Sequence, residues 1–409
     1  GLGGCALRER PLSQNPPPGG VLNVYKPRGW SSFHVVGLLR RLTGIKRIGH
    51  AGTLDPFAEG VLPMLIGRST RLLTYMDEDL KTYRVVLVPG ADTVTQDLVG
   101  EVTRVEPMTA ERVAALCAHD YALIRSELRR IEGTSEQLAL LYSAVKVGGR
   151  PLYDYARKGE EPPERPLREI TVHEARLTEV WVAEEPTVGL SDEQLQGIEA
   201  LLAAEAPGGK RGKPGRLDLA VSPELPRPVM ALAIDFAVSK GTYIRTLCAT
   251  LGERWGTGAY AYRLQRLAVR DMRSQAAALP EALEAAQTAE GAAGGEGEPD
   301  FAPWMEPWWL GPEAAVASLP VLELEHLEAT RLTQGQRLSW KQVPPRVARL
   351  LPASGAQSAA HESLAAATTG GRLIGTVRLQ RLSQFPESER DPVICVTERM
   401  ICTSEDLPC

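Results

Sequence analysis

The chain has few cysteines for its length and no long apolar run, and these absences exclude several classes of protein. Six cysteines are spread over 409 residues without a Cys-X-X-Cys pair, so neither a disulfide framework nor a tetrahedral metal site is expected. No run of about 18 or more apolar residues occurs, so no membrane span is expected. Residues 1–20 lack the apolar stretch of a secretory signal. The reducing cytoplasm is the simplest location, and Cys248, which stands among apolar residues, is expected in the core.

The composition is that of a globular protein with an uneven charge distribution. Hydrophobic residues make up 43% and charged residues 24% of the chain, whose net charge is −5. Residues 20–90 nevertheless hold ten Lys/Arg against five Asp/Glu, and residues 225–275 hold eight against three. Residues 276–300 hold six acids and no Lys or Arg. Because phosphate binding depends on local basic surface, RNA stays possible as a partner.

The length suggests more than one domain, and composition shifts place the boundaries. A Pro/Gly-rich flexible tail covers residues 1–19. A motif-rich region spans 20–275 and is interrupted at about 183–228 by a stretch whose composition predicts a loop or a solvent-facing insertion. An Ala-rich helix and a linker follow at 276–300, and a smaller unit occupies 301–409. No internal repeat is present.

Hydrophobic patterns predict a mixture of strands and helices. Strands are expected at 20–27, 81–88 and 235–241. A helix is expected after Ser31 or Ser32 and is ended by Gly44, and another begins near Tyr243 and Arg245. Alternating residues within 319–340 and 372–382 predict a small β unit. Since no regular βαβ alternation occurs, the fold class is predicted to be α+β.

The segment GHAGTLDPFAEG at 49–60 is the most informative part of the chain. Three glycines and a proline within it predict a loop, and a loop on a rigid scaffold presents a carboxylate such as Asp55 outward to a ligand. The competing interpretation is that the pair Asp55-Pro56 only starts a turn, which is the more common role of such a pair taken alone.

A series of motifs resembles the TruB family of pseudouridine synthases. GHAGTLDPFAEGVLP resembles the catalytic motif of that family over its whole length. Further matches stand in the family's order: VLNVYKPRGWSS (21–32), KTYRV (81–85), YSAVKVGGRPLYDYARKG (142–159) and SKGTYIRTL (239–247). Several long motifs in the right order and spacing are far more specific than a single short one.

The resemblance implies the roles of four residues. Asp55 falls on the essential aspartate, which acts as a nucleophile toward either the sugar or the base. Arg245 matches the arginine that pairs with this aspartate, and Tyr243 matches its companion in the pocket. Tyr83 matches the tyrosine that stacks on the flipped base and assists proton removal at C5. Without the resemblance, Arg245 would be read as a surface helix residue and Tyr83 as sheet packing.

Three further residues are expected to bind the RNA substrate. His50 matches the histidine that stacks in the space left by the extruded base; no second His or Cys lies at ligand spacing to make it a metal site. Lys26 is expected to support the active-site loop or to contact the phosphate backbone. Asp97 lies in GADTVTQDLVG (90–100), where Val94 replaces an aspartate that is common in the family.

Several basic residues are candidates for an RNA-facing surface. The alternative is that some of them form an ordinary solvated helix face. The residues are Lys26, Arg40, Arg41, Lys46, Arg47, Arg68 and Arg71.

Taken together, the resemblance implies an α+β enzyme with a mixed β-sheet pseudouridine synthase core and a small C-terminal PUA-like β domain. It would convert the T-loop uridine of tRNAs, at position 55, to pseudouridine as a stand-alone monomer without guide RNA, metal, cofactor or obligatory protein partner. The PUA-like unit would hold the acceptor side of the tRNA, or be a stabilising appendage. The rival interpretations are a catalytic subunit of a guide-RNA particle, a tRNA-folding chaperone without catalysis and, least favoured, a metal-dependent hydrolase.

Overall fold

The structure is a computed structural model that describes residues 19–143, 145–217, 219–291, 302–351, 362–381 and 393–407. The expected N-terminal tail therefore lies outside the described residues, apart from residue 19, and so does the expected linker from residue 292 onward. Within the described ranges no helix combines the length and the apolar character needed to cross a bilayer.

A large mixed sheet dominates the described part of the chain. Its ten strands run in the order β14-β1-β3-β12-β4-β11-β10-β7, with β13 beside β12 and β2 beside β3. All neighbours are antiparallel except β12 and β3. The strands are β1 (Gly20–Lys26), β2 (Ile48–His50), β3 (Glu59–Ile66), β4 (Lys81–Pro89), β7 (Gly133–Leu138), β10 (Leu167–Val182), β11 (Met230–Val238), β12 (Ala259–Val269), β13 (Met272–Arg273) and β14 (Trp309–Leu310).

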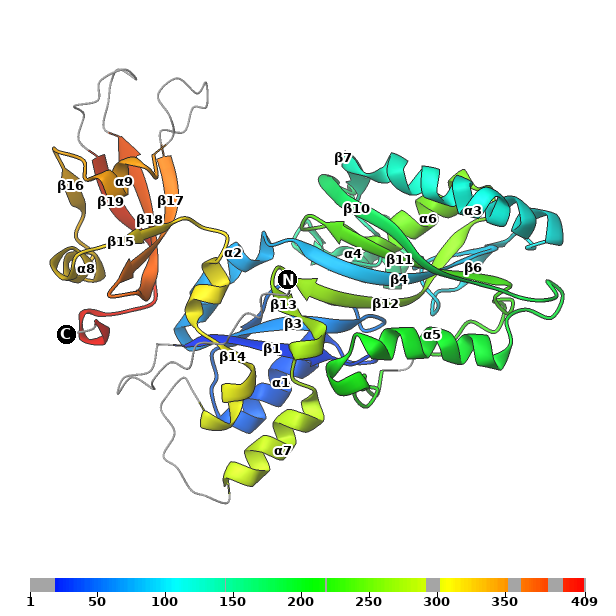
Figure 1. Cartoon of the computed structure of the whole chain (residues 1–409), viewed down its shortest axis with the longest axis horizontal. Helices are drawn as coiled ribbons and strands as arrows, with labels where there is room; N and C mark the ends of the chain where they lie inside the picture. The colour runs from blue at the N-terminus through cyan, green and yellow to red at the C-terminus, as the bar shows by residue number, and fades with distance from the viewer. Residues whose placement is uncertain are drawn as a thin grey trace, which may run out of the picture.

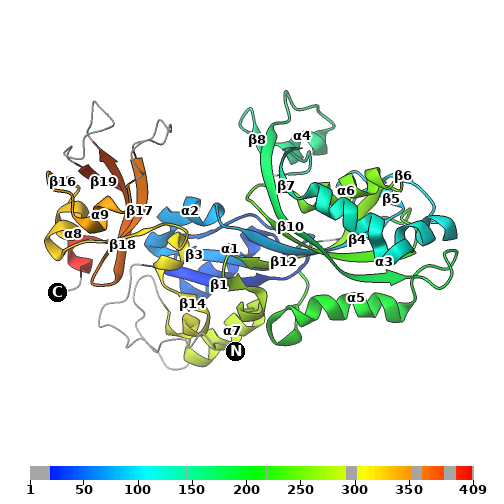
Figure 2. The same ribbon diagram turned by 45° about the horizontal axis from the view of Figure 1, so that its top comes forward.

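Helices cover both faces of this sheet, as Figures 1 and 2 show. The helices α3 and α6 lie on one face and α5 on the other, while α1 and α7 pack side by side below β1 and β3. The helices are α1 (Ser32–Thr43), α3 (Ala110–Ile131, interrupted at 118–121), α5 (Asp192–Ala204), α6 (Ile244–Arg254) and α7 (Pro280–Gly291).

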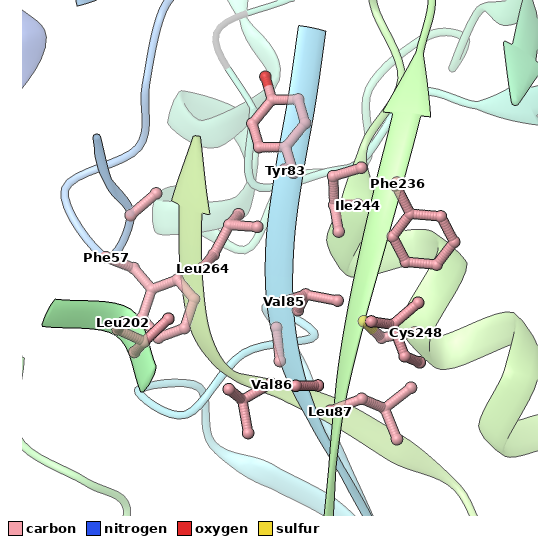
Figure 3. Close-up of a cluster of buried hydrophobic side chains, with 14 of the residues drawn as sticks. Phe57, Tyr83, Val85, Val86, Leu87, Leu202, Phe236, Ile244, Cys248 and Leu264 are labelled. Carbon is pink, nitrogen blue, oxygen red and sulfur yellow. The ribbon is translucent and has the colours of Figure 1, made fainter. Parts of the chain in front are cut away.

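The central strands are apolar on both faces because both faces are covered. Every residue of β3 is buried, and so is nearly every residue of β4 and β11. Figure 3 shows the result at β4, where Val85 and Leu87 pack with Phe236 of β11 and Cys248 of α6. Cys248 is fully buried in this cluster, and burial raises the pKa of its thiol far above the ordinary value.

Local signals explain where α1 begins and ends. The Ser31 side chain accepts a hydrogen bond from the His34 amide at 3.2 Å and caps the helix. Gly44 ends it with a φ of 72°, a conformation that glycine adopts without strain.

The insertion at 183–228 differs from the expected loop, because its first half forms α5. Ser191 and Gln194 cap the helix reciprocally, and Ile198 and Leu202 bury their side chains completely against the sheet. The Gly/Pro-rich segment that follows dominates the composition of the insertion, and it hides the helical spacing of the apolar residues in α5.

Shorter elements connect these parts. They are β5 (Ala91–Thr93), β6 (Val102–Val105), β8 (Lys146–Val147), β9 (Arg150–Pro151), α2 (Leu73–Asp77), α4 (Leu152–Lys158), and the 3₁₀ helices η1 (Gly67–Leu72), η2 (Pro207–Gly209), η3 (Ser274–Ala276), η4 (Pro303–Trp308), η5 (Pro312–Val316) and η6 (Ser404–Asp406).

A second sheet forms the C-terminal unit, in the order β15-β17-β18-β19-β16. Its elements are β15 (Val321–Glu323), α8 (His326–Thr333), β16 (Leu338–Trp340), α9 (Pro345–Ala348), β17 (Glu362–Thr369), β18 (Arg372–Arg381) and β19 (Val393–Met400). The α+β prediction is confirmed, whereas the PUA-like character of this unit stays a prediction. The strand β14, which precedes this unit in the chain, pairs with β1 and therefore belongs to the large sheet.

Two residues of the expected basic face hold the C-terminal unit instead. Arg68 pairs with Asp406 at 2.5 Å, and Arg71 donates to the Met400 carbonyl at 2.6 Å. These two guanidinium groups therefore join the two units of the fold.

Replacing Asp235 tests the buried ion pair that joins β4 to β11. Asp235 accepts two hydrogen bonds from Arg84, at 2.8 and 2.9 Å. We expect Asp235→Ala to lower the free energy of unfolding by about 3–5 kcal/mol, because the buried Arg84 would keep only Glu205, at 3.4 Å, as an ion-pair partner. The measurement is chemical denaturation, with Glu284→Ala as the control: its pair with Arg41 is exposed, so about 1 kcal/mol or less is expected. Equal losses in both variants would contradict the prediction.

Candidate active site

The loop of residues 51–58, between β2 and β3, carries Asp55 and is held by its neighbours. The Ser32 hydroxyl accepts from the Leu54 amide and donates to the Leu54 carbonyl, both at 3.0 Å. The Gly29 amide donates to the Pro56 carbonyl at 2.8 Å. The loop is therefore fixed on both sides of Asp55, even though its own backbone makes few internal hydrogen bonds.

Arg245 brings two acidic side chains together. Its guanidinium donates to Oδ2 of Asp55 at 2.6 Å, to Oδ2 of Asp97 at 3.1 Å and to the Thr95 carbonyl at 2.8 Å. Tyr243, the N-cap of α6, places Arg245 in the first turn of that helix. One cation thus connects the Asp55 loop, the β5–β6 hairpin and α6.

The environment keeps this arginine charged. Burial alone lowers the pKa of Arg245, but Asp55 and Asp97 outweigh burial and the pKa lies above its ordinary value. The side chains of Arg245 and Asp97 are only 5% and 4% exposed, whereas that of Asp55 is 36% exposed. Asp55 is therefore the member of the cluster that a ligand can reach.

The hairpin that carries Asp97 is organised around this carboxylate. Oδ1 of Asp97 accepts from the Thr95 hydroxyl at 2.7 Å and from the Val99 amide at 3.1 Å. The Thr93 hydroxyl donates to the Asp97 carbonyl at 2.7 Å. Val94 takes no part in these contacts, so the departure from the family pattern leaves the hairpin's own hydrogen bonds in place.

A cavity of about 740 Å³ opens beside Asp55. Tyr83, Tyr243 and Arg245 line it together with Asp55, so the structure brings together four of the residues that the sequence predicted. Figure 3 shows Tyr83 at the start of β4 with its hydroxyl pointing away from the apolar cluster. Further charged residues line the cavity: Asp77, Lys81, Arg168, Glu169, Lys240 and Arg266.

Two of these residues escaped the sequence reasoning although they flank Tyr83. Arg266 donates to the Tyr83 hydroxyl at 3.4 Å and to the carbonyls of Val61 and Gly52 at 2.6 and 3.0 Å. Lys81 lies two residues before Tyr83 on the same face of β4, and burial lowers its pKa to about 8. The period of a strand could have indicated Lys81, but Arg266 is opposite Tyr83 only through the register of β12 and β4.

Lys26 and Asp97 lie behind the cavity and are not among the residues that line it. The Lys26 ammonium is completely buried and donates to the carbonyls of Pro27, Trp30 and Ala58 at 3.1, 2.7 and 2.5 Å. Burial lowers its pKa to about 7, opposed by Glu59 and Asp55. Of the two roles expected for Lys26, support of the active-site loop fits this geometry and phosphate contact does not.

His50 stands apart from the cavity lining, at the end of β2. Burial, followed by the charge of Arg266, lowers the pKa of its imidazole. Its Nδ1 is buried without a hydrogen-bond partner. Among the described residues, no group of three or more His, Cys, Asp or Glu side chains is placed to hold a metal ion.

Comparison with known sequences places this arrangement in a family. Residues 40–192 match the family described as TruB family pseudouridylate synthase (N-terminal domain). The tRNA pseudouridine synthase B of Moorella thermoacetica is 36% identical over 305 residues, which are 74% of this chain and 78% of that protein. That of Streptococcus gordonii is 31% identical over 320 residues, 78% of this chain and 88% of that protein. The chain belongs to the TruB family. The resemblance seen in the motifs is thereby confirmed.

Other relatives match a shorter part of the chain or match it at lower identity. The tRNA pseudouridine synthase B of Bacillus licheniformis is 38% identical over 249 residues, 61% of this chain and 64% of that protein. The match thus spans less than two thirds of that relative's length. Among solved structures, an archaeal box H/ACA sRNP Nop10-Cbf5 complex superposes with a TM-score of 0.58 at 17% identity, covering 98% of this chain and 91% of that one. A Cbf5-Nop10-Gar1 complex gives 0.60 at 18% identity, covering 98% and 90%. At such identities the likeness concerns the fold.

Replacing Lys26 tests whether it supports the Asp55 loop from inside. We expect Lys26→Met to lower the free energy of unfolding by about 2–4 kcal/mol, because three carbonyls lose their donor in a buried site. Denaturation monitored by fluorescence measures this, with the exposed Lys46→Met as the control for loss of one charge. A loss no larger than in the control would contradict the buried role.

Proposed function

We propose that the chain isomerises uridine to pseudouridine in tRNA, with Asp55 as the nucleophile. The observation that carries the proposal is the Asp55 carboxylate at the wall of a cavity, paired at 2.6 Å with the buried guanidinium of Arg245. Membership of the TruB family and the names of the relatives support the same reaction.

The reaction needs a nucleophile, a base and a place for uracil to turn. The bond between N1 of uracil and C1′ of ribose breaks, and a bond between C5 and C1′ forms. The proton on C5 is lost while N1 gains one, so substrate and product have the same atoms. Asp55 attacks the sugar or the base, and in both routes its carboxylate is the nucleophile that Arg245 holds in place.

Tyr83 is suited to handle the proton on C5. Its ring lines the cavity that Asp55 faces, and its hydroxyl accepts a hydrogen bond from Arg266 at 3.4 Å. This hydrogen bond orients the Tyr83 hydroxyl, whose oxygen can act as the proton acceptor. Tyr243, the N-cap of α6, also lines the cavity and supplies a second aromatic ring there.

The substrate base must leave the RNA stack to reach Asp55. The cavity volume of about 740 Å³ lies within the range of sites that enclose a small ligand. Extrusion costs a few kcal/mol, and stacking by His50 in the vacated space would offset part of it. The lowered pKa of His50 favours a neutral ring there. Arg168 and Lys240 line the cavity and are the candidates for contacting the flanking phosphates, where Lys240 would exchange its pair with Glu78 for a phosphate.

The finer expectations from the sequence form part of the proposal. These are the T-loop uridine as target, action in the cytoplasm, a monomeric enzyme, and a C-terminal unit that contacts the acceptor side of the tRNA. The unit is joined to the large sheet through Arg68 and Arg71, so it could hold a substrate in a fixed relation to the cavity.

A second candidate is the catalytic subunit of a guide-RNA particle. The observation that favours it is the similarity of fold to Cbf5 in complexes with Nop10 and Gar1. The identity to these chains is 17–18%, against 31–38% to the tRNA pseudouridine synthases B, so independent action on tRNA is the better supported function. A tRNA-folding chaperone without catalysis would have no need of the Asp55–Arg245 pair.

Replacing Asp55 separates the enzyme from the chaperone. Asp55→Asn is expected to abolish pseudouridine formation in an unmodified tRNA transcript and to leave tRNA binding within a few-fold, because the amide is isosteric but not nucleophilic. Mapping of pseudouridine and filter binding are the measurements. Asp271→Asn, at a fully solvated carboxylate, serves as the control. No product at the T-loop with the unaltered chain would refute the specificity, and joint loss of product and binding would indicate a structural role.

Replacing Asp97 tests the second carboxylate on Arg245. Asp97→Asn is expected to lower the single-turnover rate about 10- to 100-fold with little change in tRNA affinity, since Arg245 would lose one of its two charged anchors and misplace Asp55. Asp92→Asn is the matched control: it lies in the same hairpin and pairs with the partly exposed Arg104. An unchanged rate would mean that the Thr95 carbonyl and Asp55 suffice to hold Arg245.

A further inference from the structure

The second half of the insertion runs behind the Asp55 loop. We call residues 206–217 the brace segment; it follows α5 and includes η2. It contacts the large sheet through an ion pair and the turn at 27–30 through backbone hydrogen bonds. Neither contact lies in the cavity.

The ion pair joins Arg211 of the brace segment to Glu59, the first residue of β3. The Nε of Arg211 donates to both carboxylate oxygens of Glu59, at 3.0 and 2.9 Å, and its Nη2 donates to Oε1 as well. Glu59 is 2% exposed. Burial alone lowers the pKa of Arg211, but Glu59 and Glu199 outweigh it, so the pKa lies above its ordinary value.

Further polar groups complete a partly buried network around this pair. Nη1 of Arg211 donates to Glu199 of α5, which also accepts from Arg263 of β12 at 2.9 Å. Oε2 of Glu59 accepts from the Tyr25 hydroxyl at 3.1 Å, and burial raises the pKa of that hydroxyl far above its ordinary value. Glu59 thus has donors on several sides, and Arg211 is the charged one.

The second contact is a close approach of two glycines. The Gly215 amide donates to the Arg28 carbonyl at 2.8 Å, and the Leu217 amide donates to the Gly29 carbonyl at 3.3 Å. A Cβ on Gly215 would lie 2.0 Å from the Gly29 carbonyl oxygen, so no other residue fits without moving the chain. The brace segment therefore holds the backbone of the turn at 27–30 in place.

Both contacts lead to the Asp55 loop. The turn donates from Gly29 to the Pro56 carbonyl at 2.8 Å, one residue after Asp55. Glu59 begins the strand that receives the loop, four residues after Asp55. The brace segment therefore fixes the backbone on the C-terminal side of Asp55 at two points, while Arg245 fixes its carboxylate.

We propose that the brace segment positions Asp55 for catalysis, with Glu59, Arg211 and Gly215 as positioning residues. The proposal rests on the proposed function of the site. Stability alone is a weak reason for a buried ion pair, because an apolar pair of similar volume would serve as well or better. A pair with fixed donor directions, in contrast, sets the position of the strand end to which the loop is attached.

The test compares Arg211→Met, Glu59→Gln and the double variant in single-turnover reactions at saturating tRNA. We expect each single variant to slow the reaction about 10- to 100-fold with tRNA affinity changed less than about 3-fold, because a small displacement of a reacting group is enough for such a loss. The double variant should be no slower than the slower single variant, since both act through one contact. Arg211→Lys should recover part of the rate.

Arg227→Met is the matched control, because Arg227 lies in the same insertion and pairs with the exposed Asp192. Its rate should equal that of the unaltered chain. If Arg211→Met lowers the melting temperature but leaves the rate unchanged, the pair is only a structural anchor and the proposal is overturned. A drop in tRNA affinity that accounts for the whole loss would overturn it too, since the segment would then be an RNA contact.

Amide hydrogen exchange separates failure of this proposal from failure of the proposed function. The amides of Leu54, Asp55, Phe57 and Ala58 should exchange faster in Arg211→Met and in Gly215→Val than in the unaltered chain or in Arg227→Met, whether or not the chain forms pseudouridine. Unchanged exchange would overturn the brace even in an active enzyme. Faster exchange in a chain that yields no pseudouridine would refute the proposed function and leave the brace in place.

Discussion

The site depends on one buried guanidinium that two carboxylates share. Arg245 can remain charged at 5% exposure only because Asp55 and Asp97 compensate the lost hydration. The two acids are not equivalent: Asp97 is enclosed by donors from its own hairpin, whereas Asp55 is reached from the cavity. Asp55 is thus held by a fixed cation and still open to the cavity, and a carboxylate nucleophile needs both. Three separate chain segments, the Asp55 loop, the β5–β6 hairpin and α6, therefore fix the position of the Asp55 side chain.

A loop rich in glycine cannot hold Asp55 by itself, so its rigidity comes from neighbours. The Lys26 ammonium donates to the Ala58 carbonyl, and the Ser32 hydroxyl at the start of α1 bonds to the backbone of Leu54. The brace segment acts through Glu59 and Gly29. Each of these groups is buried or half-buried and points to backbone atoms or to a carboxylate outside the cavity. Their placement explains why residues that never meet a substrate can still affect the geometry of the reacting group.

Sequence reasoning found the parts of the site that lie in contiguous motifs and missed those that depend on packing. Local patterns and the family's motifs predict a loop at 49–60, the strand with Tyr83 and the helix start with Arg245, and the structure brings them together. The loop itself is shorter than predicted, because its ends belong to β2 and β3. The burial of Lys26 was not predictable, because a lysine is rarely fully buried and its sequence context gives no sign of it. Arg266 joins the cavity only through strand register. The helix α5 was overlooked because the glycines and prolines after it dominate the composition of the insertion.

The charge distribution shows why a whole-chain sum says little about an RNA partner. Basic residues expected on one surface turn out to serve different ends: Arg68 and Arg71 attach the C-terminal unit, while Arg41 pairs with Glu284 of α7. Acidic residues of α7 are likewise used internally, since Glu281 accepts from the amide of Lys213. The cavity is lined by cations and anions together, and one of its cations, Lys240, pairs with Glu78. A net charge of −5 therefore says little about any one surface, because several of the acids pair with basic residues of the same protein.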